Sequence, residues 1–167
     1  ASCGDAPLKP PAVGVTRGRL TVLRGVFDIP PTCVAQCRFS VDAYGGAVSC
    51  AGMSGSLVYS AGIEGMMSPV SRFQAEDRLG DAVVYWGDTG DSWARFCARV
   101  AYPILGFSTP RVVHSFCTTS SDLTASAYAK QIVRSFRRAH DGADETCGLP
   151  IEQASDAAHQ GDEAGER

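Results

Sequence analysis

One histidine in this chain stands close in sequence to residues that could form a hydrolytic site. His114 follows a short segment that contains Asp88, Asp91 and Ser92, and the other two histidines lie near the C-terminal end. A serine nucleophile needs a histidine that accepts its proton and a carboxylate that orients the histidine. One hypothesis is therefore a small secreted hydrolase that uses His114 with Asp88, Asp91 or Ser92.

The surroundings of His114 favour a different interpretation. Side chains alternate between the two faces of a β-strand, and this alternation places His114 on an apolar face with Val112 and Phe116. A histidine on such a face is expected to be a hydrogen-bonded core residue, so we assign no catalytic residue. The Asp-Thr-Gly sequence at 88–90, with Ile104-Leu105-Gly106 after it, resembles the signatures of an aspartic protease, but the thirteen residues between the two motifs are too few for such a site, so a hairpin turn fits better.

Two pairs of soft ligands define a second alternative, a zinc site. Three residues separate Cys33 from Cys37, and two residues separate His114 from Cys117. Thiolate and imidazole ligands suit tetrahedral zinc. The long separation between the two pairs makes disulfides the simpler explanation. We therefore expect neither a metal nor a cofactor.

Seven cysteines are many for a chain of this length, and they are spread along it. This distribution is typical of structural disulfides formed in an oxidising compartment. The start, Ala1-Ser2-Cys3-Gly4, also resembles the end of a bacterial lipoprotein signal, in which Cys3 would carry a lipid anchor. Six cysteines then remain for disulfides: Cys33, Cys37, Cys50, Cys97, Cys117 and Cys147.

A β-hairpin is expected to position two of these cysteines and His114. Residues 92–102 and 111–117 are rich in β-formers and flank a connection with a proline at each end. With the turn centred on Phe107, Cys97 lies opposite Cys117 and Val100 lies opposite His114. Directly opposed residues of an antiparallel pair lie close enough for a disulfide, so we predict Cys97–Cys117. Cys147 is then expected to bond to Cys33, Cys37 or Cys50.

The segment after the hairpin predicts a long amphipathic helix from about Ser121 to His140. Thr119 with Asp122, or a serine at 120 or 121, would cap its N-terminus. Its apolar positions, which should dock on the sheet, are Leu123, Ala125, Tyr128, Ala129, Ile132, Phe136 and Ala139. Basic residues gather toward its C-terminal half, where they favour the helix dipole: Lys130, Arg134, Arg137, Arg138 and His140.

Composition and charge narrow the classes of function. The chain is 44% hydrophobic and 20% charged, which is ordinary for a globular domain. No run approaches the roughly 18 apolar residues that a membrane-spanning helix needs. A net charge of −3 argues against nucleic acid as the main partner.

These observations predict an α+β fold in which a mainly antiparallel sheet packs against one long C-terminal amphipathic helix and is stabilised by disulfides. We expect an extended N-terminal arm at residues 1–12, a single domain at 13–150 and a flexible acidic tail at 151–167. The predicted function is a secreted or cell-envelope binding domain that engages a protein or small ligand through surface loops.

Overall fold

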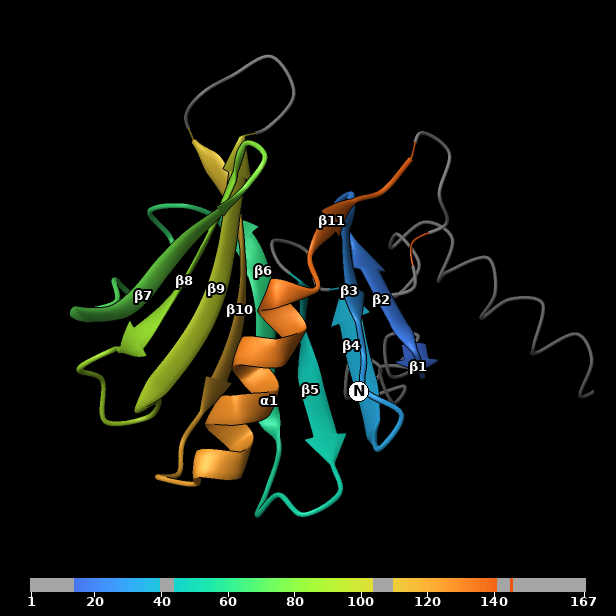
Figure 1. Ribbon diagram of the computed structural model, residues 1–167, viewed down its shortest axis with the longest axis vertical. Helices are drawn as coiled ribbons and strands as arrows, with labels where there is room; N and C mark the ends of the chain where they lie inside the picture. The colour runs from blue at the N-terminus through green and yellow to red at the C-terminus, as the bar shows by residue number, and fades with distance from the viewer. Residues whose placement is uncertain (1–13, 40–43, 104–109, 141–144, 146–167) are drawn as a thin grey trace, which may run out of the picture.

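The fold is built mainly from antiparallel strands, and the computed structural model describes residues 14–39, 44–103, 110–140 and 145 (Figure 1). Eight strands form one sheet, and every pairing in it is antiparallel. In spatial order these strands are β1 (Gly14–Thr16), β4 (Cys33–Phe39), β5 (Tyr44–Cys50), β6 (Leu57–Ile63), β10 (Arg111–Thr118), β9 (Phe96–Pro103), β8 (Ala82–Asp88) and β7 (Arg72–Leu79).

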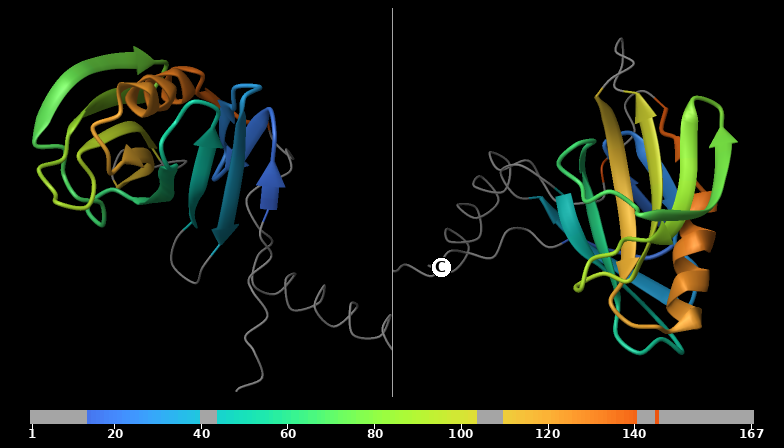
Figure 2. Two further views of the ribbon diagram at one scale, coloured as in Figure 1. Left: turned by 90° about the horizontal axis from the view of Figure 1, so that it is seen from below. Right: turned by 90° about the vertical axis from the view of Figure 1, so that its left-hand side faces the viewer.

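A small second sheet and one helix cover a single face of the large sheet. The small sheet has the order β11 (Arg137–Arg138), β3 (Gly25–Asp28) and β2 (Arg19–Val22). The helix α1 (Leu123–Arg134) lies across β9 and β10, and the large sheet curls around it (Figure 2). The α+β class with a mainly antiparallel sheet is therefore confirmed. The expected arm at 1–12 and tail at 151–167 lie outside the described residues.

The central hairpin has the register expected from the sequence. Cys97 pairs with Cys117, Val100 with His114 and Tyr102 with Val112. The even-numbered residues of β9 and β10 face α1 and enter the main core, together with Phe27 of β3. Alternation along the strands thus fixed which side chains meet the helix.

The opposite face of β9 and β10 is buried as well, which the sequence did not indicate. Because β6 neighbours β10 but β7 lies at the far edge, the connection at 64–71 must cross behind β10, β9 and β8. Its Ser68 carbonyl accepts a hydrogen bond from Arg99, and its Ser71 backbone N–H donates to the Asp88 carbonyl over 3.0 Å. A second segment, Thr89 to Arg95, covers the same face beside this crossover.

The helix is shorter than the predicted span of Ser121 to His140, since it has 12 residues and ends at Arg134. Its N-cap is Asp122, whose side chain accepts from the Thr124 backbone N–H, so the other proposed caps are wrong. It ends because the Ser135 hydroxyl donates to the Ile132 carbonyl and accepts from the Asp28 N–H. The expected apolar stripe is also wrong at Leu123, which is 84% exposed. Its buried face consists of Ala125, Ala129, Ile132 and Val133.

A pair of consecutive glycines lies inside a strand of the large sheet. Gly45 and Gly46 belong to β5, and Gly46 pairs with Cys37 of β4. A Cβ at Gly46 would lie 1.9 Å from the Gln36 carbonyl oxygen, so only glycine permits this approach of the two strands.

Within the described residues, no helix is both long enough and apolar enough to cross a membrane.

Phe136 tests the packing of the main core. Its ring lies 5.1 Å from that of Tyr102 and 5.5 Å from that of Phe27, and the residue is buried just after α1 ends. Replacing Phe136 with Ala should lower the free energy of unfolding by about 3–5 kcal/mol, because it leaves a cavity. Leu123→Ala, in the exposed first turn, should cost less than about 1 kcal/mol in the same chemical denaturation experiment. Equal effects of the two substitutions would contradict this packing.

Candidate functional site

His114 lies fully inside the core, with a tyrosine at each ring nitrogen. The Tyr59 hydroxyl lies 2.8 Å from Nδ1, and the Tyr102 hydroxyl lies 2.7 Å from Nε2. Tyr102 donates its only proton to the Leu23 carbonyl over 2.6 Å, so it must accept from Nε2–H. Tyr59 then donates to Nδ1, and the neutral imidazole has every hydrogen bond that it can make.

Burial lowers the pKa of His114 to about 3 and raises the pKa of Tyr59 and Tyr102. A histidine with this pKa stays neutral at physiological pH and is a very weak base. Its two ring nitrogens are both engaged, so neither is free to accept a proton from a serine. His114 therefore has the geometry of a hydrogen-bonded core residue.

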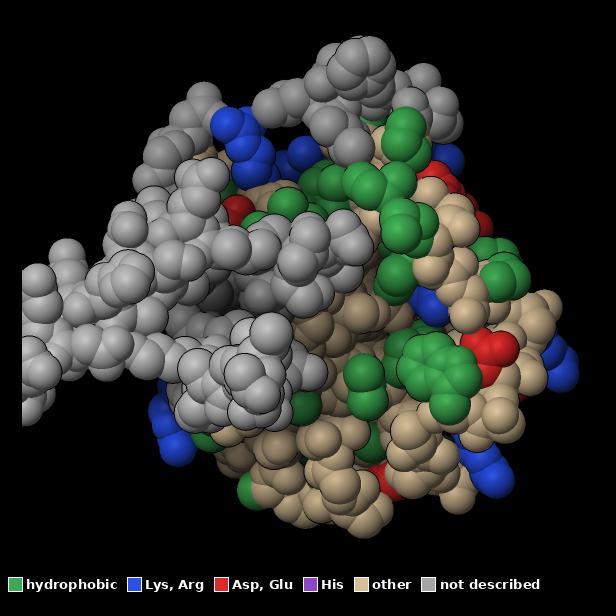
Figure 3. All heavy atoms as spheres, turned by 180° about the vertical axis from the view of Figure 1, so that it is seen from behind, with side chains coloured by type: hydrophobic (Ala, Val, Ile, Leu, Met, Phe, Trp, Pro, Cys, Tyr) green, Lys and Arg blue, Asp and Glu red, His purple; other side chains and the backbone are tan. Residues whose placement is uncertain are grey.

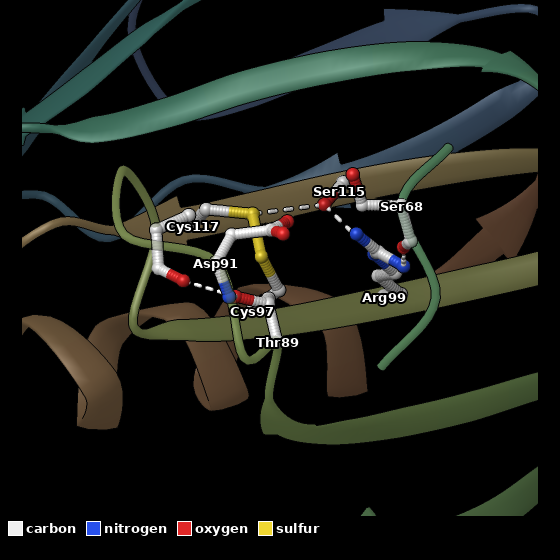
Figure 4. Close-up of a disulfide and its surroundings, with 8 residues drawn as sticks. Ser68, Thr89, Asp91, Cys97, Arg99, Ser115 and Cys117 are labelled. Carbon is white, nitrogen blue, oxygen red and sulfur yellow. Dashed lines mark hydrogen bonds between the residues drawn. A yellow bond between two sulfur atoms is a disulfide. The ribbon is translucent and has the colours of Figure 1, made fainter. Parts of the chain in front are cut away.

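The structure does not bring the proposed hydrolytic residues together. His114 makes no hydrogen bond to Asp88, Asp91 or Ser92, because its partners are tyrosines. Asp88 and Ser92 are exposed, at the end of β8 and in the segment that follows. Asp91 belongs to the opposite face of the sheet, in the surroundings of the Cys97–Cys117 disulfide (Figure 4).

The alternative zinc ligands are engaged in other bonds. Cys117 is bonded to Cys97, Cys33 is bonded to Cys50, and Cys37 is also part of a disulfide. None of these sulfurs is a free thiolate. In the part of the chain that the structure describes, no three His, Cys, Asp or Glu side chains lie close enough together to hold a metal ion.

Two cross-strand disulfides join neighbouring strands in the described residues. The predicted Cys97–Cys117 bond is confirmed, with a Cα–Cα distance of 4.1 Å. Cys33 and Cys50 are likewise directly opposed, on β4 and β5, with a Cα–Cα distance of 4.0 Å. Sequence reasoning missed this pair, although Cys33, Ala35 and Cys37 alternate as the buried face of a strand should. Cys147, expected to bond to this region, lies outside the described residues.

A polar cluster surrounds the Cys97–Cys117 disulfide on the face that the crossover covers (Figure 4). Arg99 is only 3% exposed, and its Nε donates to the Ser115 hydroxyl over 3.1 Å. Because the Ser115 oxygen accepts there, its own proton can point at the Cys117 sulfur, which lies 3.1 Å away. Arg99 also binds the Ser68 carbonyl and forms no ion pair with a described carboxylate.

Asp91 contributes an unusual atom to this cluster. Its backbone N–H donates to the Thr89 hydroxyl over 3.1 Å, and that hydroxyl donates to the carbonyl of Ala94. Ala94 packs directly against Cys97 and Cys117. The Asp91 Oδ2 atom is buried, yet it has no hydrogen-bond partner. A buried carboxylate oxygen without a partner costs free energy, so its presence calls for an explanation.

The second notable feature is a groove between α1 and the ends of β7, β8 and β9. It has a volume of about 260 Å³. Its lining residues are Gln74, Asp88, Arg95, Phe96, Ser120, Ser121, Leu123, Ser126 and Lys130. A neighbouring hollow along α1 shares Lys130 and extends the surface to Arg134.

Cations dominate this groove. The Lys130 Nζ atom lies 5.5 Å from the ring centroid of Phe96, and the Arg134 guanidinium carbon lies 4.7 Å from that of Trp86. Neither these two cations nor Arg95 forms an ion pair in the described residues, although Asp88 lines the same groove. The sequence signal for this surface was the gathering of basic residues along the helix.

Comparison with known proteins adds no relative to this picture. No family model, no curated protein and no solved structure matches the chain.

The acid stability of the protein should report on His114. The unfolded chain takes up a proton near pH 6.5, whereas the folded chain takes it up near pH 3, so folding excludes a proton between these values. The free energy of unfolding should therefore decrease as the pH falls from about 6.5, with a slope from this group of up to about 1.4 kcal/mol per pH unit. Above about pH 7 the group contributes no pH dependence.

The matched variant is His114→Gln, compared with the wild type by chemical denaturation at a series of pH values. Its free energy of unfolding at neutral pH should be about 1–3 kcal/mol lower than that of the wild type, because Tyr59 and Tyr102 lose their hydrogen-bond partner. It should also lose the slope that His114 contributes below pH 6.5. Parallel pH profiles for the two proteins would show that His114 is not held neutral in the fold.

Proposed function

We propose that this chain is a secreted or cell-envelope binding domain and that it holds an acidic group of a protein or small ligand in the groove beside α1. The observation that carries the proposal is the set of cations on this surface, Arg95, Lys130 and Arg134, none of which forms an ion pair with a described carboxylate. Among the described residues that line the groove, Asp88 is the one carboxylate. The local charge favours an anion although the whole chain is acidic.

The aromatic floor supports this role. Trp86 and Phe96 are buried side chains of β8 and β9, and they lie beneath Lys130 and Arg134. Cation–π contact holds the two positive groups in place without neutralising them, so they remain able to bind an anion. The Ser121 hydroxyl, which also lines the groove, is an additional hydrogen-bond donor.

The size of the groove limits what enters it. A volume of about 260 Å³ is below the range of pockets that enclose a drug-sized molecule. It suits one or two acidic side chains of a protein partner, or a small organic acid. The disulfides are consistent with an extracellular location, where such a scaffold would present the groove to its ligand.

The hydrolase alternative receives no comparable support. It requires His114 to accept a proton from Ser92, but both ring nitrogens of His114 are hydrogen-bonded to tyrosines inside the core. Binding is therefore the function that the described geometry favours.

The proposal can be tested by NMR titration with citrate and with a hexaglutamate peptide. Either probe should shift the amide signals of α1 and β8, and the affinity should decrease as salt is added, because the attraction is between charges. The double variant Lys130→Ala and Arg134→Ala should weaken binding at least tenfold. The control is Arg72→Ala and Arg78→Ala, two exposed cations of β7 that do not line the groove, and it should bind as the wild type does. Binding that is absent, or equal in both double variants, would refute the assignment.

A further inference from the structure

The two cross-strand disulfides provide a comparison within one molecule. Each joins directly opposed residues of neighbouring antiparallel strands, and their Cα–Cα distances are 4.0 Å and 4.1 Å. Their surroundings differ. Among the described residues, the Thr32 hydroxyl lies 4.0 Å from the Cys33 sulfur, whereas the Ser115 hydroxyl lies 3.1 Å from the Cys117 sulfur. Of these two disulfides, Cys97–Cys117 is the one that adjoins the polar cluster.

We propose that Cys97–Cys117 is a redox-active disulfide, which low-molecular-weight thiols reduce more readily than Cys33–Cys50. The Ser115, Arg99 and Asp91 side chains stabilise its reduced form. The disulfide and its polar cluster lie on the face of β9 and β10 opposite α1, so the proposal does not depend on the binding groove.

The first support is the chain of hydrogen bonds that ends at Cys117. Arg99 Nε donates to Ser115 Oγ over 3.1 Å, which leaves the Ser115 proton to face the Cys117 sulfur. A hydroxyl polarised by a guanidinium stabilises negative charge on a neighbouring sulfur much better than it stabilises a neutral disulfide. Arg99 forms no ion pair with a carboxylate of the described residues. The cluster therefore favours Cys117 as a thiolate leaving group.

The second support is the orphan oxygen of Asp91. In the oxidised protein the buried Oδ2 atom has no hydrogen-bond partner among the described residues, and a disulfide has no proton to donate to it. Reduction creates two S–H groups in the pocket whose surroundings Asp91 shares (Figure 4). A thiol is a hydrogen-bond donor, although a weak one. Reduction would thus supply the donor that the oxidised protein lacks.

The reaction is a balanced thiol–disulfide exchange. The thiolate of an external thiol such as glutathione attacks the Cys97 sulfur, the S–S bond breaks, and its electron pair passes to the Cys117 sulfur. A second thiol then attacks the mixed disulfide and releases the Cys97 thiolate together with the oxidised reagent. Two thiol molecules are oxidised, and two protons end on Cys97 and Cys117.

Access to the sulfurs requires a local opening, because both cysteines are buried in the closed form. The segment from Thr89 to Arg95 covers them, and two backbone bonds hold its far end, Thr89 N–H to Arg95 carbonyl at 3.4 Å and Arg95 N–H to Thr118 carbonyl at 3.0 Å. Trp93 in this segment is 52% exposed, so its side chain does not anchor the cover. Such short segments open without global unfolding.

The test is equilibration of the intact protein in glutathione redox buffers, followed by alkylation and mass spectrometry of tryptic peptides. Cys97, Cys117 and Cys50 fall in three separate peptides, 96–99, 112–130 and 39–72, so each disulfide is followed independently. The equilibrium constant for reduction should be at least tenfold larger for Cys97–Cys117 than for Cys33–Cys50, which corresponds to about 30 mV. Equal constants, or joint reduction of both disulfides in one step, would refute the proposal.

Variants separate the polar cluster from the mere position of the disulfide. Asp91→Ala and Ser115→Ala should each bring the constant of Cys97–Cys117 several-fold closer to that of Cys33–Cys50. Ser92→Ala, an exposed serine of the same segment, should leave the ratio unchanged. If the Ser115→Ala protein does not fold, the proposal is tested by the ratio of the two equilibrium constants in the wild type and in Asp91→Ala. A ratio unaffected by Asp91→Ala would contradict the role of that carboxylate, and none of these outcomes depends on citrate binding in the groove.

Discussion

The pairing of β9 with β10 is the constraint on which the rest of the structure depends. These two strands lie at the centre of the large sheet, and both of their faces are buried. Their register sends His114 toward the helix and sends Arg99 and Ser115 toward the crossover. A slip of one residue would exchange the two sets and place a guanidinium among aromatic rings. In that position the buried charge would lack its hydrogen bonds to Ser115 and Ser68, and this free-energy cost disfavours the slipped register.

The hydrogen bonds of His114 connect this strand pair to the small sheet through Tyr102 and the Leu23 carbonyl. Since Tyr102 donates to the Leu23 carbonyl, the imidazole of His114 can be satisfied in only one tautomer. The turn that carries this carbonyl has positive φ at both Leu23 (49°) and Arg24 (63°), a conformation that side chains other than glycine and asparagine rarely adopt. Tertiary hydrogen bonds therefore hold a local backbone that the sequence alone disfavours.

The sequence could predict the features that depend on local alternation. Opposed cysteines and a period of two gave the hairpin register and the Cys97–Cys117 bond. The helix end was not predictable from periodicity, because Phe136 continues the apolar pattern while Ser135 hydrogen-bonds to Asp28 of a distant strand. The Gly46 position in β5 was equally hidden, since its reason is the close approach of Gln36 on another strand.

The polar cluster behind the sheet was out of reach for the same reason. The alternation along the strands suggests that Arg99 and Ser115 are exposed. They are buried because the crossover places Ser68 over them. Only the order of the strands, with β7 at the far edge, makes that coverage necessary. Likewise, the sequence offered Asp91 as a possible partner of His114, but the burial of its Oδ2 atom depends on how the segment folds against the disulfide. Long-range topology, rather than local pattern, created this site.

The groove and the disulfide meet in one segment of the chain. Asp88 and Arg95 line the groove at the two ends of this segment, while Ala94 within it packs on Cys97 and Cys117. An opening that exposes the sulfurs must also displace Arg95, because the Arg95 N–H bond to Thr118 holds the closed position. An anion bound by Arg95 would then favour the closed form and slow the access of a thiol to the sulfurs, while the equilibrium constant for reduction, which compares two closed forms, would stay the same.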